Sequence, residues 1–348
     1  MSNNDVQRKN NISRLFPQGV PLLWCPPLTH YRSDKSIDFE RMKKHINHIA
    51  PYINSYLIPG STSDGWEISF EEYKQILNFV FKEFIPDSEI NVLIGLLRTD
   101  SSDVRKFLDY AVKFLQENNI ETDMDNYRSS RFKGFVLCAP KGENLTQQEI
   151  KDAIVPILEK KYPIVLYQLP QITQNEISPE IISELAEKYP NFYMMKDSSG
   201  QDKVAYAGLD YHDMILLRGA EGNYHKYLKA AGGPYDGFLL STGNTFAKGL
   251  KYIVDQVISG NLSDAEKEST ELTKIIDEVF TIASTIPFGN AFTNSNKLLD
   301  HIFAHGKQWL KASAPLTHAG EILSQEILQK IDEILQKSSY YPSKGYLE

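Results

Sequence analysis

Residues 163–200, PIVLYQLPQITQNEISPEIISELAEKYPNFYMMKDSSG, contain one complete copy of the pattern that decides the fold. An apolar run of strand length (163–170) precedes a segment with helical periodicity (178–189), and a second apolar run (191–196) follows. Ser178 is a suitable helix N-cap, and the proline after it suits the first helical position. Continuous apolar runs are typical of strands buried on both faces of a parallel sheet. The stretch therefore predicts a strand–helix–strand unit.

The same pattern recurs along most of the chain. The apolar runs are residues 20–28, 54–61, 91–97, 132–140, 163–170, 191–196, 214–219 and 235–241. The helical segments are residues 38–49, 69–84, 101–117, 146–160, 178–189 and 244–259, and other candidate caps are Ser36, Ser69 and Thr146. Eight strand–helix units predict a TIM (β/α)8 barrel. A doubly wound open sheet is the alternative, but PPLTHYR (26–32) replaces a Gly-rich phosphate loop after the first strand.

The sequence also predicts the domain organisation. A polar N-terminal segment (1–18) precedes the barrel (19–260), and a helical C-terminal extension (261–348) follows it. We expect the last residues, 337–348, to be loosely held, as chain ends often are. An insertion at 121–131 precedes the fourth strand, and it is expected either to cover the barrel mouth or to contact another subunit.

Composition excludes several classes of protein. The net charge of −8 argues against nucleic acid or an anionic membrane as the main partner. No apolar run is long enough to cross a bilayer, and the N-terminus lacks the apolar segment of a secretory signal. The two cysteines, Cys25 and Cys138, provide neither a disulfide framework nor a zinc cluster. A cytoplasmic enzyme or binding protein is therefore expected.

Candidate site residues follow the strands, because a TIM barrel builds its active site at the carboxyl ends of its strands. Lys196 is the strongest candidate. Only a neutral amine attacks a carbonyl, and at an ordinary pKa roughly one lysine in 2,500 is neutral at pH 7. Burial in a barrel core raises that fraction. The alternative is a lysine that points into solvent or pairs with Asp197.

Other strand ends supply polar groups with more than one possible role. Tyr167 suits a proton-transfer role, although a core tyrosine with a satisfied hydroxyl is the commoner case. Ser61 and Thr62 lie in a small-residue turn whose N–H and hydroxyl groups suit a carboxylate, although such turns are often only turns. Arg98 suits either a substrate carboxylate or a surface ion pair. The remaining candidates for substrate binding are Glu221, Leu239 and Ser241.

Five motifs in order resemble the dihydrodipicolinate synthase and N-acetylneuraminate lyase family of pyruvate-linked Schiff-base lyases. They are GSTSDGWEIS (60–69), NVLIGLLRTDSSD (91–103), VLYQLP (165–170), YMMKDSSG (193–200) and GGPYDGFLLSTGN (232–244). The resemblance runs from about residue 20 to about residue 335.

The resemblance implies a TIM barrel with a helical extension, assembled as a homotetramer of two tight dimers or as a homodimer. It implies that Lys196 forms an imine with a 2-keto acid and that Tyr167 is the general acid/base. Ser61 and Thr62 would hold the carboxylate of the keto acid. No metal or organic cofactor is implied, because the lysine imine itself withdraws electrons.

Two departures bear on the substrate. Dihydrodipicolinate synthases have an arginine where this chain has Ile172, and tyrosines where it has Lys141 and Gly142. Their absence argues against lysine biosynthesis and leaves the proton relay to another group, for which Tyr31 is a candidate. The turn also has Ser63 and Asp64 where the family has Gly-Glu, which is expected to change its geometry.

Three functions remain open. The leading hypothesis is a class I lyase that cleaves or forms a 2-keto-3-deoxy acid with pyruvate as product or donor. The Ser-Thr pair at 61–62 and the STGN segment (241–244) favour this hypothesis, because they resemble the corresponding segments of sialic-acid lyases. The second is dehydration of a 2-keto sugar acid through the same imine. The third is a non-catalytic barrel that binds a keto acid, which the missing relay tyrosine favours and the presence of both Lys196 and Tyr167 disfavours.

Overall fold

The computed structural model describes residues 2–84 and 89–348. Its eight strands are hydrogen-bonded in the order β1-β8-β7-β6-β5-β4-β3-β2, which is the strand succession of a nearly closed parallel barrel. The strands are β1 (Leu23–Trp24), β2 (Ser55–Ile58), β3 (Asn91–Gly95), β4 (Phe132–Leu137), β5 (Ile164–Gln168), β6 (Phe192–Asp197), β7 (Ile215–Arg218) and β8 (Gly237–Leu239). Each lies within one of the apolar runs or extends one residue beyond it. The predicted TIM barrel with C-terminal helices is confirmed.

The central strands are buried along their whole length, as their unbroken apolar sequences predict. Every residue of β4, β5 and β6 is buried. The strands pair in parallel, and the β5–β6 register places Tyr167 opposite Lys196. The register of β6 with β7 places Lys196 opposite Leu217. Neighbouring parallel strands therefore bring the two main candidate residues together.

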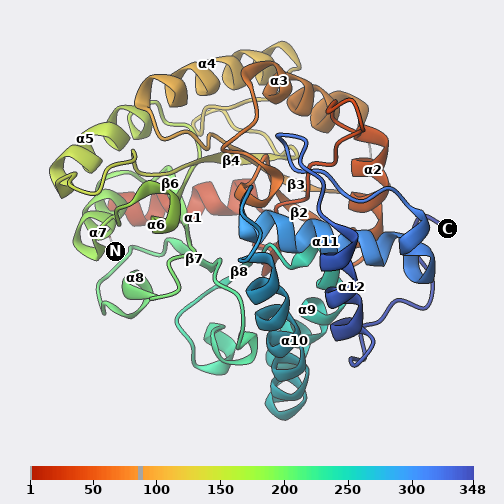
Figure 1. Ribbon diagram of the computed structural model, residues 1–348. Coiled ribbons are helices and arrows are strands. Elements are labelled where there is room, and N and C mark those ends of the chain that lie inside the picture. Colours follow the sequence, from red (N-terminus) through yellow and green to blue (C-terminus); the bar gives the residue numbers. More distant parts are fainter. Residues whose placement is uncertain (1, 85–88) are drawn as a thin grey trace. The chain divides into compact units, whose positions relative to one another are not determined.

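The chain folds as two compact units. Unit 1 comprises Met1–Leu22, Ile90–Ala220 and Gly233–Leu239, and unit 2 comprises Leu23–Glu89, Glu221–Gly232 and Leu240–Glu348. The helices of unit 1 are α1 (Asn3–Leu15), α4 (Ser101–Glu117), α5 (Gln147–Leu158), α6 (Pro170–Thr173), α7 (Pro179–Lys188) and α8 (Lys203–Tyr206). Figure 1 shows α4, α5 and α7 along the outer side of the unit 1 strands.

The polar N-terminal segment forms α1, which is anchored to the start of β6. Ser2 caps the helix in a capping box with Asp5. Arg8 is fully buried, and its guanidinium donates to the carbonyl oxygens of Phe192 at 3.0 Å, Tyr189 at 3.0 Å and His212 at 2.7 Å. Several charge-assisted bonds to carbonyls compensate for burying one cation.

The insertion at 121–131 packs within unit 1. The Tyr127 hydroxyl donates to the carbonyl of Phe132, the first residue of β4, at 2.5 Å. Met124 is buried, and its carbonyl accepts a hydrogen bond from Arg14 of α1. These contacts lie at the amino end of β4, away from the strand ends where a barrel places its chemistry. The insertion therefore does not cover the ends of β5 and β6 that carry Tyr167 and Lys196.

Unit 2 contains the C-terminal helices. Its helices are α2 (Phe39–Ile49), α3 (Phe70–Asn78), α9 (Gly243–Ile258), α10 (Leu262–Ala283), α11 (Ala291–His305) and α12 (Gln325–Leu335), and its 3₁₀ turns include η1 (Ser61–Ser63) and η3 (Tyr224–Lys226). A π-helical turn, η2 (Phe79–Glu83), continues α3, so the segment predicted at 69–84 is one helix that changes its winding. Helix α10 packs against α9, α11 and α12 (Figure 1).

The prediction that residues 337–348 are loosely held is wrong. The Tyr346 hydroxyl donates to Asp300 Oδ1 at 2.6 Å, and its ring stacks on His48 at 4.3 Å between centroids. Its backbone N–H donates to the carbonyl of Phe303. The tail is held because one aromatic side chain reaches both α2 and α11, which its polar local sequence does not reveal.

Helix caps follow the sequence at three of four positions. Ser69, Thr146 and Ser178 each accept a hydrogen bond from the third helical N–H. The cap of α2 is Asp38 instead of Ser36, whose hydroxyl donates to Asp34. Aspartate is as favourable as serine at a helix N-cap, so the residue type alone could not distinguish Asp38 from Ser36.

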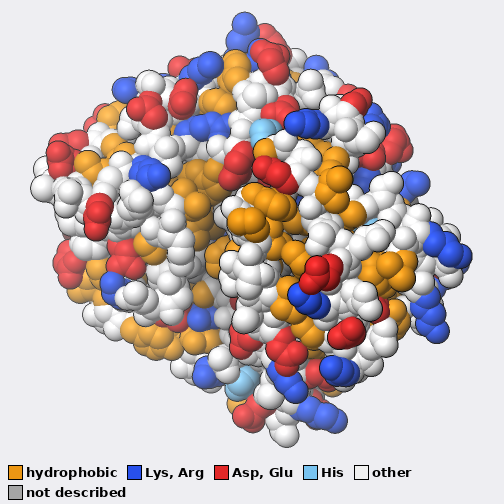
Figure 2. All heavy atoms as spheres, viewed as in Figure 1, with side chains coloured by type: hydrophobic (Ala, Val, Ile, Leu, Met, Phe, Trp, Pro, Cys, Tyr) orange, Lys and Arg blue, Asp and Glu red, His pale blue; other side chains and the backbone are white. Residues whose placement is uncertain are grey.

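The surface and the helices agree with the composition. Figure 2 shows acidic and basic side chains interspersed over the visible face, with apolar groups between them. Among the described residues, none of the helices is both long and apolar enough to span a membrane.

Candidate active site

Lys196 and Tyr167 form the centre of the candidate site in unit 1. Both side chains are almost fully buried, with 3% and 2% of their surface exposed. The Lys196 Nζ atom lies 4.0 Å from the centroid of the Tyr167 ring. The geometry follows from their opposite positions on β5 and β6. A buried amine beside a phenol side chain is compatible with imine chemistry that uses a local proton carrier.

Gly219, directly after β7, leaves the space that the Lys196 side chain occupies. A Cβ atom at position 219 would lie 2.6 Å from Lys196 Cε and still closer to Ser198 Oγ. The Gly219 N–H donates to the Asp197 carbonyl at 2.7 Å, so its backbone is fixed against β6. Cys138 lies near the same amine, and burial raises the pKa of its thiol while Lys196 opposes the rise. Cys138 is therefore neutral beside the lysine.

A second layer of buried polar groups holds the loops after β6 and β7. Arg218 donates to Asp202 at 3.1 Å, and the Tyr235 hydroxyl donates to the same carboxylate at 2.6 Å. Asp197, next to the lysine in sequence, accepts the Ser199 N–H at 2.9 Å, and burial raises the pKa of its carboxyl group. Its other oxygen has no hydrogen-bond partner among the described residues. This layer fixes the backbone that follows Lys196.

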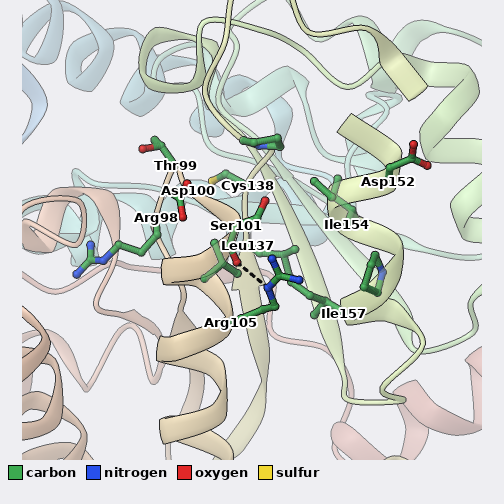
Figure 3. A pocket seen from close by; sticks show the side chains of 14 residues that line it. Arg98, Thr99, Asp100, Ser101, Arg105, Leu137, Cys138, Asp152, Ile154 and Ile157 are labelled. Atoms are coloured by element: carbon green, nitrogen blue, oxygen red, sulfur yellow. Dashed lines mark hydrogen bonds between the residues drawn. The ribbon is translucent and has the colours of Figure 1, made fainter. Parts of the chain in front are cut away.

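Arg98 lies at the edge of a cavity of about 310 Å³ between α4 and α5. Its guanidinium lies 4.0 Å from the Phe107 ring centroid and donates to the Leu97 carbonyl at 2.8 Å. Asp100, two residues further along the chain, caps α4. In Figure 3 the Arg98 side chain extends away from Arg105 and the other residues that line the cavity. Leu239, the last residue of β8, is fully buried.

In unit 2, Ser61 and Thr62 form the turn η1. The Ser61 hydroxyl accepts a hydrogen bond from Trp66 Nε1 at 2.8 Å, and Thr62 is 4% exposed. Asp64 ends the turn in the left-handed conformation, with φ of 57°, which aspartate tolerates better than most residues. The Ser63 hydroxyl donates to the Pro27 carbonyl. At the two positions where the family has Gly-Glu, Ser63 therefore forms a hydrogen bond and Asp64 ends the turn.

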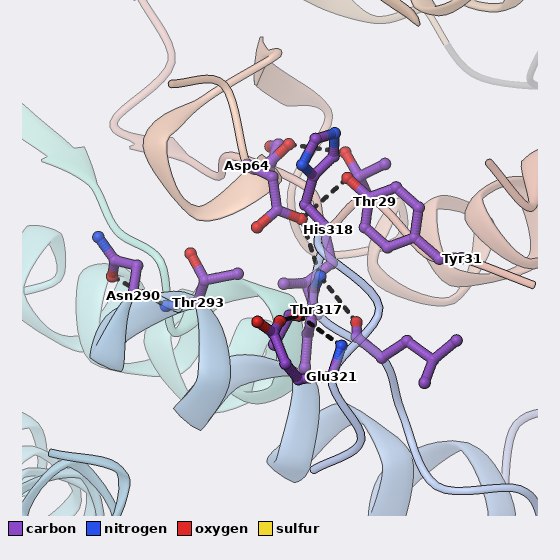
Figure 4. Close-up of polar contacts among 12 residues, drawn as sticks. Thr29, Tyr31, Asp64, Asn290, Thr293, Thr317, His318 and Glu321 are labelled. Carbon is purple, nitrogen blue, oxygen red and sulfur yellow. Dashed lines mark hydrogen bonds and ion pairs between the residues drawn. The ribbon is translucent and has the colours of Figure 1, made fainter. Parts of the chain in front are cut away.

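Asp64 is the centre of a buried cluster that includes Tyr31 (Figure 4). Lys297 of α11 lies 2.8 Å from Asp64 Oδ2, and its Nζ is 4.6 Å from the Tyr31 ring centroid. The Tyr31 hydroxyl donates to the same oxygen at 3.1 Å. Burial and the Asp64 carboxylate raise the pKa of Tyr31 far above its ordinary value. The sequence suggested Tyr31 as a proton relay, but missed Lys297, which lies far away in sequence.

Glu221 and Ser241 contact each other in unit 2. The Ser241 hydroxyl donates to Glu221 Oε1 at 2.7 Å, and the Thr242 N–H donates to the same atom at 3.1 Å. Glu221 Oε2 accepts the hydroxyls of Thr242 at 2.7 Å and Tyr224 at 2.9 Å. The carboxylate therefore ties together the segments that follow β7 and β8. This arrangement suits a positioning role as well as it suits the predicted substrate contact.

The positions at which dihydrodipicolinate synthases have an arginine and tyrosines lie in unit 1. The Gly142 N–H donates to the Thr173 carbonyl at 2.9 Å, and the Lys141 N–H donates to the Thr99 carbonyl at 3.1 Å. Ile172 precedes Thr173 in the short helix α6. Hydrogen bonds thus hold the backbone of this region in place. Its isoleucine and glycine occupy the positions where the resemblance would place an arginine and a tyrosine.

Comparisons with known proteins extend the resemblance beyond these motifs. The model of the Dihydrodipicolinate synthetase family matches residues 126–294, a region that includes Tyr167, Lys196 and Glu221. A 4-hydroxy-tetrahydrodipicolinate synthase of Archaeoglobus fulgidus is 24% identical over 326 residues, which cover 92% of this chain and 98% of that protein. The chain therefore resembles the dihydrodipicolinate synthetase family over the region that carries Tyr167 and Lys196. The resemblance supports a lyase of the class I aldolase type.

Solved structures share the fold of this chain along most of its length. YagE, a prophage protein of E. coli K12 solved in complex with pyruvate, has a TM-score of 0.70 at 16% identity, covering 90% of this chain and 97% of that one. A variant of the 2-keto-3-deoxygluconate aldolase of Sulfolobus solfataricus has a TM-score of 0.68 at 17% identity, with 91% and 96% covered. At these identities the likeness shows the fold.

Proposed function

We propose that the protein is a Schiff-base-forming lyase that cleaves or forms a 2-keto-3-deoxy acid, with pyruvate as product or donor. The observation that carries the proposal is the buried contact between the Lys196 amine and the Tyr167 ring. Lys196 is the proposed nucleophile, and Tyr167 the proposed general acid/base.

In this mechanism the neutral Lys196 amine attacks the keto carbon, and loss of water gives a protonated imine. The imine withdraws the electron pair of the bond between C3 and C4, so that bond breaks as the C4 hydroxyl loses its proton. Tyr167 is the proposed carrier of protons to and from the substrate oxygens, and a buried site keeps bulk water away. No metal or organic cofactor takes part in this reaction.

Ser61 and Thr62 are the proposed ligands of the keto acid's carboxylate, because a turn of small hydroxyl residues offers both O–H and N–H donors. Arg98, Leu239, Glu221 and Ser241 remain proposed contributors to the substrate site. The Glu221–Ser241 pair supports a role in holding loops, and Arg98 is one of the residues that line the cavity between α4 and α5.

The identity of the sugar-acid substrate is inferred from what is missing. Ile172 and Gly142 provide neither the guanidinium nor the phenol that dihydrodipicolinate synthases use for their second substrate. The fold is shared by a 2-keto-3-deoxygluconate aldolase and by dihydrodipicolinate synthases alike, so these departures are what favours an aldolase.

A panel of 2-keto-3-deoxy acids tests this function. The wild-type enzyme should release pyruvate and an aldehyde in equal amounts, and Lys196→Met should release neither. A dehydrated keto acid without pyruvate would instead identify a dehydratase. Binding of keto acids with no product from any substrate would overturn the proposed lyase.

A further inference from the structure

A cluster of three side chains of the kinds that bind metals lies in unit 2, and none of the three belongs to the proposed active site. His30 follows β1, His45 lies in α2 and Asp300 lies in α11. His30 Nε2 is 3.0 Å from His45 Nδ1 and 3.9 Å from Asp300 Oδ2. One ligating atom from each residue lies within 4.8 Å of the other two. Three separate elements therefore bring two imidazoles and a carboxylate to one point.

The imidazole of His45 is oriented as metal-ligating histidines are. Its Nε2 lies 2.8 Å from the backbone carbonyl of Asn244, so Nε2 carries the proton and donates. The lone pair is then on Nδ1, which faces His30. Metal-bound histidines typically donate their other N–H to a carbonyl or carboxylate, which fixes tautomer and ring orientation.

Asp300 is held as an anion by groups that leave it able to bind a cation. Tyr346 donates to its Oδ1 at 2.6 Å, and Arg41 donates to its Oδ2. His45 Nε2 also lies 3.4 Å from Oδ1. A carboxylate has about four lone-pair sites, so these neighbours do not exhaust it. The positive charge of Arg41 opposes the binding of a cation. The two neutral imidazoles favour binding in spite of this charge, because each offers a nitrogen lone pair to the metal.

A cavity of about 670 Å³ gives access to the cluster. Its lining includes His30, Arg41 and Asp300, together with His301 and Lys297. Four-coordinate metal sites with three protein ligands keep one position for water or another small ligand. Here that position would face the cavity.

We propose that His30, His45 and Asp300 bind a divalent transition-metal ion, for which Zn²⁺ is the best match. Ligand atoms about 2.0–2.1 Å from a tetrahedral ion lie about 3.4 Å from one another, and the spacing of the cluster brackets that value. Two imidazoles and one carboxylate suit zinc and its first-row neighbours, whereas Mg²⁺ and Ca²⁺ prefer oxygen ligands.

A metal-free network is the alternative explanation of the same distances. In it, His30 Nε2–H donates to His45 Nδ1, and Arg41 alone balances the charge of Asp300. The two explanations differ in one measurable property, which is stoichiometric metal binding that depends on His30.

The test uses the full-length protein after EDTA treatment and dialysis into metal-free buffer. Zn²⁺ titration by calorimetry should give one ion per chain, and Co²⁺ should produce the visible absorption bands of a tetrahedral site. His30→Ala should weaken Zn²⁺ binding by at least about tenfold and abolish those bands. The matched control is His318→Ala. His318 lies 3.1 Å from Glu72 and is not one of the three proposed ligands, so its loss removes a histidine beside a carboxylate without removing a ligand.

Circular dichroism and thermal unfolding establish that each variant is folded. If His30→Ala fails to fold, His30→Gln replaces it, because the amide can keep a hydrogen bond to His45. The proposal is overturned if the wild-type protein binds less than one ion per chain in either titration. Affinity that survives loss of the His30 imidazole, or falls equally in the control, also overturns it.

Discussion

Gly219→Ala should disable the candidate nucleophile without altering any group that reacts. A methyl group at this position would lie 2.6 Å from Lys196 Cε, whereas ordinary contact begins at 3.4 Å. The lysine must therefore withdraw by the difference, about 0.8 Å. A displacement of about 1 Å at a reacting group can reduce turnover by about a hundredfold. We expect kcat with the best keto-acid substrate to fall by roughly that factor.

The assay is steady-state kinetics, together with the rate at which borohydride and pyruvate modify Lys196. Gly142→Ala is the matched control, because its new methyl would meet the half-exposed Leu145 side chain, which can move aside. A folded Gly219→Ala protein that forms the adduct at the wild-type rate would refute the steric argument. Equal losses in both variants would attribute the effect to general destabilisation.

Three further predictions concern the same molecule. Tyr167→Phe should lower kcat by about 10²–10⁴-fold while pyruvate still modifies the lysine; unchanged turnover would remove the phenol from proton transfer. Asp64→Asn removes the carboxylate beside the buried Lys297 ammonium and should lower the free energy of unfolding, measured in urea, by about 3–5 kcal/mol. The control Asp38→Asn should lower it by less than about 1 kcal/mol, because asparagine caps a helix as well as aspartate does. Burial and then His301 lower the pKa of His305 to about 4, so the folded state binds fewer protons than the unfolded state, and stability should fall as the pH drops from about 6.5 towards 4. His305→Asn should flatten that part of the melting-temperature profile, and an unaltered profile would contradict the assignment.

The fold was predictable because its signals are local. Eight apolar runs and the caps at Ser69, Thr146 and Ser178 are each written within a few residues. Pairing of Tyr167 with Lys196 was also predictable, since the carboxyl ends of neighbouring parallel strands meet at one edge of a sheet.

Contacts between distant segments were not predictable. Lys297 beside Asp64, and Asp300 beside His45, join residues more than 230 positions apart in sequence. Tyr346 holds the chain end for the same reason. No local pattern distinguishes these side chains from surface residues, because their partners are chosen by how the C-terminal helices pack.

The space around Lys196 illustrates a different limit. A glycine after a strand has several possible causes, and the sequence does not show that a Cβ at Gly219 would strike the lysine. Similarly, Glu221 and Ser241 were expected to face a substrate, and the structure shows them bonded to each other.

Peptide mapping after incubation with pyruvate and borohydride tests the central claim most directly. Lys133 is the internal control, a lysine as deeply buried on β4 whose Nζ donates to the carbonyls of Leu15 and Ser130. We expect a reduced pyruvate adduct on Lys196 and an unmodified Lys133. An unmodified Lys196 in active, folded protein would contradict it.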